Sequence, residues 1–259
     1  MHPLRFFLLL CCFLTGVFSV VGQADSSRRP LSLSYLASYP RNMVAMVRSP
    51  AGWDREKWFQ VGGSVILVGA LIPMDEVLNI PFENWDTPGG EKFGETGDAV
   101  GDLPFQFGIT GLAMGVGLVA NNKQWQQFAL DNLQAQLFTG GITWIVKELT
   151  HRARPYTENG NYAWYGPFSG SGHTSFFSGH TSLAFSTATM IFLHSGRKWW
   201  VGALGYGVAS GVGLSRMQQQ QHWASDVLAG ALVGTAVSGF IYRQQEKRRS
   251  DIQKLKPLP

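Results

Sequence analysis

The sequence predicts an all-α protein, a helical bundle with its functional motifs at helix ends, associated with a membrane. Several apolar segments of helical length are joined by short turns, and no alternating strand pattern accompanies them. Gly is abundant at 31 residues, and many lie inside apolar stretches, where small residues let helices approach closely. The 259 residues, 45% hydrophobic and 15% charged, suit one domain with appendages. A mean hydropathy of −0.01 keeps a soluble bundle as the alternative.

Residues 1–22 have the pattern of a secretory signal peptide or an uncleaved N-terminal anchor. Arg5 supplies the positive charge, and residues 6–14 form an apolar run. Both cysteines, Cys11 and Cys12, lie in this segment, so cleavage would leave a mature chain without disulfide or thiol chemistry. Residues 23–57 are polar and mixed in composition, and we expect a poorly structured leader there.

Residues 58–102 are expected to hold a short helix and a loop. The helix, over 58–71, is stopped by Pro73 at a length that is marginal for spanning a membrane. The segment 81–102 is rich in Gly, Pro and charge, which predicts the loop.

Residues 103–242 form the expected helical core. Its predicted helices cover 103–120, 125–150, 181–194, 199–214 and 224–242. Residues 243–259 form a basic tail, with six Lys or Arg against two acidic residues. Such a tail after an apolar helix suits the cytoplasmic side of a membrane, although a solvated tail on a soluble protein has the same charge. The net charge of +4 is no nucleic-acid signature, and we expect no nucleic-acid partner.

The topology follows from these charges. If residues 1–22 cross the membrane outward and residues 58–72 do not cross it, every motif falls on the outer side and the basic segments fall inside. A bacterial-type inner membrane with a periplasm-facing site is therefore expected, with a soluble periplasmic protein as the alternative.

The first motif is K-E-L-T-H-R-A-R-P at residues 147–155. Lys147 and Arg154 are seven residues apart, which puts them on nearly one face of a helix that Pro155 ends. Two such cations can grip separate oxygens of one phosphate. A solvated basic helix end has the same pattern. His151 and Arg152 lie off that face and are left without a role.

The second motif is Ser178-Gly179-His180, directly before an apolar helix. The start of a helix offers N–H donors to an anion, and Ser178 adds a hydroxyl. The same tripeptide also occurs at residues 171–173, but that copy lies in a Gly/Ser loop and does not precede an apolar helix. The later copy is therefore the candidate site.

The third motif is S-R-M-Q-Q-Q-Q-H-W-A-S-D at residues 215–226. Arg216 follows an apolar helix, and Asp226 comes four residues after His222, so these two can meet on one helical face. A carboxylate beside an imidazole fixes its tautomer and leaves the other nitrogen free to attack. A structural pair at a helix start remains the alternative.

Together the motifs resemble the type 2 phosphatidic acid phosphatase superfamily, which includes class A bacterial acid phosphatases and vanadium haloperoxidases. The signature of that superfamily is K-x6-R-P, then P-S-G-H, then S-R-x5-H-x3-D. This chain departs from it at Phe177, which replaces the usual proline.

The resemblance implies a metal-independent phosphatase with no cofactor and an active site at helix ends. His222 would be the nucleophile that forms a phosphohistidine, Asp226 would orient it, and His180 would protonate the leaving oxygen. The implied phosphate ligands are Lys147, Arg154, Ser178, Gly179 and Arg216. The expected substrate is a membrane lipid phosphate such as phosphatidic acid or a polyprenyl diphosphate. A soluble nonspecific acid phosphatase acting on small phosphate esters and a vanadate-dependent haloperoxidase are the alternatives.

Overall fold

The computed structural model describes residues 32–254, which are helical apart from the connecting loops. Within that range the only extended pairing is an isolated bridge between Arg152 and Trp164, so the predicted all-α class is confirmed. The α-helices are α2 (Leu33–Leu36), α3 (Ser38–Arg48), α4 (Arg55–Leu71), α5 (Asp75–Glu83), α6 (Pro88–Gly101), α7 (Leu103–Val119), α8 (Lys123–Thr150), α9 (Gly179–His194), α10 (Trp199–Gln218) and α11 (Ala224–Lys254). Three short 3-10 helices, η1 (Ser49–Gly52), η2 (Ile72–Met74) and η3 (Pro155–Thr157), join them.

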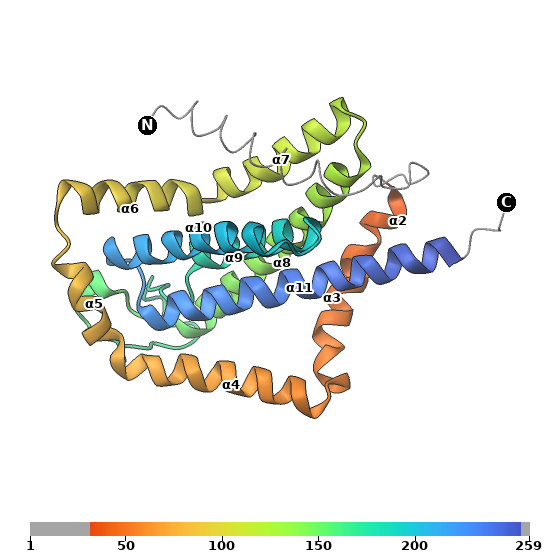
Figure 1. Cartoon of the computed structure of the whole chain (residues 1–259). Helices are drawn as coiled ribbons and strands as arrows, with labels where there is room; N and C mark the ends of the chain where they lie inside the picture. Colours follow the sequence, from red (N-terminus) through yellow and green to blue (C-terminus); the bar gives the residue numbers. More distant parts are fainter. Residues whose placement is uncertain (1–31, 255–259) are drawn as a thin grey trace.

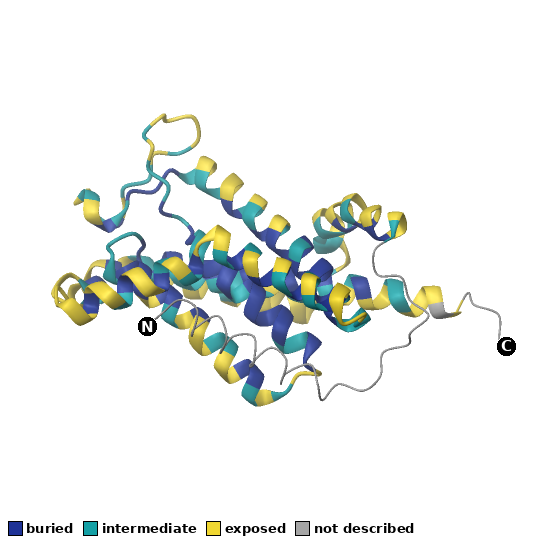
Figure 2. Ribbon diagram, turned by 90° about the horizontal axis from the view of Figure 1, so that it is seen from above, coloured by how far each residue is buried: buried dark blue, intermediate teal, exposed yellow. Residues whose placement is uncertain are grey.

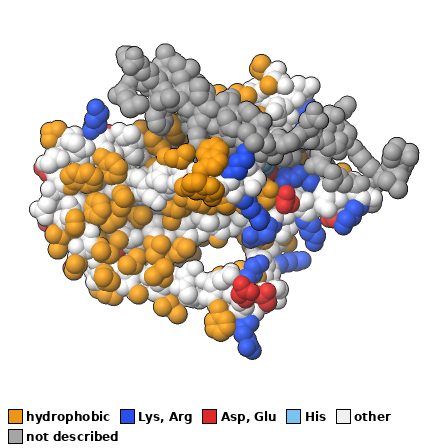
Figure 3. Space-filling view, viewed as in Figure 1, with side chains coloured by type: hydrophobic (Ala, Val, Ile, Leu, Met, Phe, Trp, Pro, Cys, Tyr) orange, Lys and Arg blue, Asp and Glu red, His pale blue; other side chains and the backbone are white. Residues whose placement is uncertain are grey.

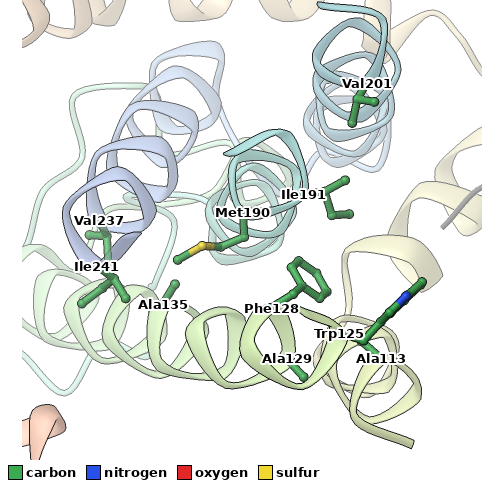
Figure 4. Close-up of a cluster of buried hydrophobic side chains, with 10 residues drawn as sticks. All are labelled: Ala113, Trp125, Phe128, Ala129, Ala135, Met190, Ile191, Val201, Val237 and Ile241. Atoms are coloured by element: carbon green, nitrogen blue, oxygen red, sulfur yellow. The ribbon is translucent and has the colours of Figure 1, made fainter. Parts of the chain in front are cut away.

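Helix α9 is the centre of the bundle and packs against α8, α10 and α11 (Figure 1). The apolar core lies between these helices, where Phe128, Met190 and Ile241 are fully buried (Figure 4). Buried residues are concentrated in the central helices, and exposed ones follow the outer helices and loops (Figure 2). The central position of α9 matters because its first residues belong to the second motif.

Helices α7 to α11 lie where the five core helices were expected, but α11 is longer than predicted. It continues to Lys254, so residues 243–254 are not a tail, and only 255–259 lie outside the described residues. No Gly or Pro interrupts 243–254, and Arg249 Nη1 donates to the buried Asp131 Oδ2 at 2.9 Å. The extra turns are thus held by a contact that the sequence does not reveal.

The expected leader is also wrong over its described part. Residues 33–48 form α2 and α3, which pack their polar side against the bundle. Tyr35 donates to Asp131 Oδ1 at 3.0 Å, and Asn42 donates to Gln134 Oε1 at 3.2 Å. The polar composition of this segment predicted disorder, but its polar side chains are buried and form hydrogen bonds with the bundle. The predicted signal segment 1–22 lies outside the described residues.

The loop expected over 81–102 is replaced by helix. Helix α5 reaches Glu83, and α6 starts at Pro88 after the N-cap Thr87, whose hydroxyl accepts from Gly90 N at 3.1 Å. The glycines of α6 that suggested a loop form its packing face instead, and α6 lies against α10. At Gly97 an added Cβ would come within 2.0 Å of the Ser215 hydroxyl, so the two helices touch nearly backbone to backbone.

Two helical stretches of the described chain are long and apolar enough to cross a membrane, namely Arg55–Glu83 and Ala224–Ile252. Helix α4 ends at Leu71, as predicted, but the helical path continues through Pro73, which lies in the opening turn of η2 where its missing N–H is tolerated. With η2 and α5 the stretch reaches Glu83, so the expectation that it is only marginally long enough to span a membrane is wrong. Helix α4 has no buried residue, and Trp58, Phe59 and Ile66 are exposed. Such a surface suits lipid better than water.

Candidate active site

The three motifs converge at one end of the bundle, beside α5 in Figure 1. There α8 ends, α9 begins, α10 ends and α11 begins, and the loop 151–178 connects α8 to α9. Four helix ends therefore bring together side chains that are up to 79 residues apart in sequence, from Lys147 to Asp226.

Lys147 and Arg154 meet, but not on one helix as predicted. Helix α8 ends at Thr150, and His151 takes the left-handed conformation with φ of 41°, so Arg154 lies in the loop that follows. Both cations nevertheless bind Thr174: Lys147 Nζ donates to its carbonyl oxygen, and Arg154 Nη2 donates to its hydroxyl at 3.2 Å. The loop thus brings about the pairing that helical spacing was expected to provide.

Ser178 and Gly179 form the start of α9, as expected. Ser178 is the N-cap and is fully buried, and its hydroxyl accepts from the Thr181 hydroxyl at 2.8 Å. A Cβ added to Gly179 would lie 4.0 Å from Lys147 Cε, which puts the first turn of α9 beside the lysine. The opening N–H groups of a helix have no partner within it, so this turn has donors that can bind an anion, and the phosphate-binding role of Ser178 and Gly179 stays a prediction.

His222 lies in the short connection before α11 and is 3% exposed. Its Nδ1 is 3.7 Å from Asp226 Oδ2, too far for a hydrogen bond, and it has no hydrogen-bond partner among the described residues. The pair is close enough for the carboxylate to orient the ring once the distance shortens. Such contacts are often long before substrate binds.

Asp226 itself is held by a buried network that the sequence did not reveal. Its Oδ1 accepts from Arg152 Nη1 at 2.6 Å, and its Oδ2 accepts from the Ser175 hydroxyl and from Trp223 N at 3.0 Å. Arg152 also donates through Nη2 to Asp75 Oδ2 at 2.7 Å. Arg152, Asp75 and Asp226 are all fully buried, and one guanidinium forms ion pairs with both carboxylates.

Arg216 and His180 share a partner on α6. His180 Nε2 is 3.1 Å from Asp98 Oδ1, and Arg216 Nη1 donates to the same oxygen. Arg216 lies in the last turn of α10, which reaches Gln218, and not after the end of the helix as expected. The proposed acid and one proposed phosphate ligand therefore lie side by side.

Burial, with help from the neighbouring cations, lowers the pKa of both histidines and so favours their neutral forms. Burial lowers the pKa of His222 to about 3; Asp226 opposes this, and the charges of Lys147 and Arg154 add to it. Burial also lowers the pKa of His180 to about 4, helped by the positive charge of Arg216. The cations Lys147, Arg154 and Arg216 around these neutral histidines favour the binding of an anion.

Four residues that contact the site were not predicted from the sequence, namely Asp75, Asp98, Arg152 and Ser175. Only Arg152 carried a signal, since it lies within the first motif, but its burial depends on Asp75, 77 residues earlier. His173 stays in the loop, where its ring stacks on Tyr165 with centroids 5.0 Å apart. Both copies therefore lie near the cations, since Thr174 next to His173 binds Lys147 and Arg154, while His180 shares Asp98 with Arg216. The choice of the later Ser-Gly-His copy stays a prediction.

Residues 129–250 match the sequence profile of the PAP2 superfamily. A lipid A 1-phosphatase of Porphyromonas gingivalis is 35% identical over 129 residues, 49% of this chain and 26% of that protein. Lipid phosphate phosphatase 1 of Arabidopsis thaliana is 35% identical over 139 residues, 43% of this chain and 42% of that protein. The chain therefore spans less than half the length of these relatives.

The fold has a solved counterpart in a transmembrane PAP2-type phosphatidylglycerolphosphate phosphatase from Bacillus subtilis. The two superpose with a TM-score of 0.56 at 23% identity, over 71% of this chain and 92% of the other. The matched segment holds every residue of the three motifs, at the helix ends where the cations and histidines meet. Residues 129–250, just under half of this chain, are therefore similar in sequence to the PAP2 superfamily.

Proposed function

We propose that this protein is a metal-independent phosphatase that hydrolyses the phosphate ester of a membrane lipid through a phosphohistidine. One observation carries the proposal, namely the convergence of three cations, a helix start and two histidines at one end of the bundle. Phosphoryl transfer spreads negative charge over the equatorial oxygens, so a fixed cationic cradle supplies what the reaction needs.

His222 is the nucleophile in this proposal. Its Nδ1 faces Asp226, which leaves Nε2 to attack the phosphorus. The N–P bond forms as the ester P–O bond breaks, and the imidazolium charge that develops is stabilised by the carboxylate. The low pKa of His222, about 3, keeps the imidazole unprotonated and nucleophilic at neutral pH.

His180 is the proposed acid. It gives a proton to the leaving ester oxygen and then takes one from the water that attacks the phosphohistidine, which releases phosphate and restores both histidines. In the empty site its pKa of about 4 leaves it neutral, so it gains its proton when the dianionic phosphate raises that pKa. Lys147, Arg154, Arg216 and the start of α9 hold the phosphate, each donor contributing on the order of 3 kcal/mol to the transition state.

The lipid substrate class rests on two facts. Both curated relatives are named as phosphatases of lipids, and the described chain has two helices apolar enough to cross a membrane. The phosphate of a lipid headgroup lies at the surface of the bilayer, which is where a site at helix ends would meet it.

We further propose that the site faces the periplasm or its equivalent. The topology argued from the sequence required residues 58–72 not to cross the membrane, whereas Arg55–Glu83 is long and apolar enough to cross it, so the proposal rests on where the basic residues lie in the structure. Lys and Arg gather at the opposite end of the bundle, around α3 and the C-terminal part of α11 (Figure 3). Arg55 at the start of α4 and Lys198 before α10 belong to that end, and the positive-inside bias assigns it to the cytoplasm. A membrane-impermeant maleimide should label Ser171→Cys but not Lys198→Cys in intact cells, in a C11S/C12S background. The reverse labelling would overturn the orientation.

The activity test uses the purified full-length protein in detergent without added metal. The panel is phosphatidic acid, a polyprenyl diphosphate, phosphatidylglycerol phosphate, lipid A and a water-soluble aryl phosphate. The lipid proposal expects kcat/KM to be highest for one of the lipids, and a clear preference for the soluble ester would replace it with a nonspecific phosphatase. Acid-labile labelling from a 32P-substrate should vanish in His222→Ala and persist in His173→Ala; label that survives in His222→Ala would rule out the phosphohistidine.

A further inference from the structure

Asp98 is the carboxylate that touches two members of the site. Its Oδ1 lies 3.1 Å from His180 Nε2 and accepts from Arg216 Nη1. It belongs to α6, which precedes the segment 129–250 matched to the superfamily, so no motif contains it. The side chain is 46% exposed, as expected for a group at the mouth of a site.

The backbone of α6 is what brings Asp98 there. The flanking residues Gly97 and Gly101 sit directly on the site helices. A Cβ at Gly97 would come within 2.0 Å of Ser215 Oγ, and one at Gly101 would come within 2.9 Å of His180 Cβ. Only glycine permits this approach, so the position of Asp98 beside His180 is set by helix packing and not by a flexible side chain.

Four charged groups face His180 from the elements packed against it. Arg216 of α10 and Lys147 of α8 lower its proton affinity, as does burial, whereas Asp98 and Asp102 raise it. Asp102 lies farther away, at 3.9 Å, and its Oδ1 accepts from Leu103 N at 2.8 Å as the N-cap of α7. Of the two carboxylates, Asp98 is the closer one to His180. It therefore does most to favour the protonated form of the His180 imidazole, which is the form that can act as the acid.

We propose that Asp98 is the positioning residue of the leaving-group acid. It accepts the Nε2–H of His180, so Nδ1 carries the proton that passes to the ester oxygen as the P–O bond breaks. The Nε2–H stays on Asp98 throughout, and water returns a proton to Nδ1 in the second step. The same carboxylate holds the guanidinium of Arg216 toward the phosphate. This inference rests on the proposed function, since it assigns a partner to the proposed acid.

The test compares Asp98→Asn with Glu95→Gln, which removes one charge from an exposed position on the same helix. An opposite charge within about 4–6 Å is worth about one pKa unit or more, so Asp98→Asn should move the alkaline limb of the kcat profile to lower pH by at least that amount. Above that limb, kcat should fall about tenfold or more. The loss should be greater for an alkyl phosphate than for p-nitrophenyl phosphate, whose leaving group needs little acid help. Glu95→Gln should match the wild type.

A second readout does not depend on turnover. NMR of the protein labelled at histidine, with His180 assigned from the His180→Gln spectrum, should give a lower pKa for His180 in Asp98→Asn than in the wild type. An unchanged pKa, or an alkaline limb that stays in place with equal losses on both substrates, would overturn the proposal. If the wild type hydrolyses no phosphate ester but the pKa still falls, the proposed function has failed while the pairing stands.

Discussion

Gly230 of α11 gives the sharpest test of how packing supports the site. A Cβ at this position would lie 2.6 Å from the carbonyl oxygen of Ser178, which is the N-cap of α9. Non-bonded heavy atoms prefer separations of about 3.5 Å or more, so Gly230→Ala must move the two helices apart by about 1 Å. This contact joins the helix that carries Asp226 to the helix start that binds phosphate, and Ser178 N also donates to Asp226 O at 3.1 Å.

The expected cost follows from two opposing terms. Overpacking of this kind costs about 1–3 kcal/mol, and replacing Gly by Ala inside a helix returns up to about 1 kcal/mol. Stability should therefore fall by about 0–3 kcal/mol. Activity should fall much further, because a misplacement of about 1 Å in an active site reduces the rate by as much as about 100-fold.

The assay is kcat/KM on the preferred substrate, together with the midpoint of thermal unfolding in detergent. Gly239→Ala is the matched control, since it makes the same change in the same helix and its Cβ would meet only Arg243 Nη1 at 3.5 Å. The control should keep full activity and a midpoint equal to or above that of the wild type. If Gly230→Ala and Gly239→Ala have the same kcat/KM within about twofold, the close contact at Ser178 does not position the site.

Four further expectations concern single side chains. Arg152→Met leaves two buried carboxylates without their counterion and should lower the free energy of unfolding by about 3–5 kcal/mol, read from thermal or denaturant unfolding; a loss as small as that of a surface change would refute the network. His173→Ala should change kcat/KM little, and a loss equal to that of His180→Ala would favour the earlier Ser-Gly-His copy. The reaction needs His222 unprotonated, and its pKa of about 3 means that kcat/KM should show no acid limb from this group near pH 6.5. The positive charge of Lys147 lowers the pKa of His222, so Lys147→Met should raise that pKa and move the acid limb of kcat/KM to higher pH. A shift of the acid limb to lower pH would contradict this electrostatic explanation.

The failures of sequence reasoning share a cause. Glycine-rich composition predicts a loop at α6 and polar composition predicts an unstructured leader at α3, but composition alone does not show that each helix packs against a partner. The spacing of Lys147 and Arg154 predicted the right pairing for the wrong reason, since α8 ends at Thr150 and the loop completes the contact through Thr174.

The helical class, the core helices and the candidate residues of the three motifs could be predicted from the amino-acid sequence. Apolar periodicity depends on neighbours three and four residues away, and each motif is a short continuous segment, so both can be recognised along the chain. Which carboxylates lie beside the histidines, and which glycines let the helices approach, depends on the packing of the folded bundle. Asp75 and Asp98 reach Arg152 and His180 across 77 and 82 positions of sequence, and such distant contacts depend on how whole helices pack.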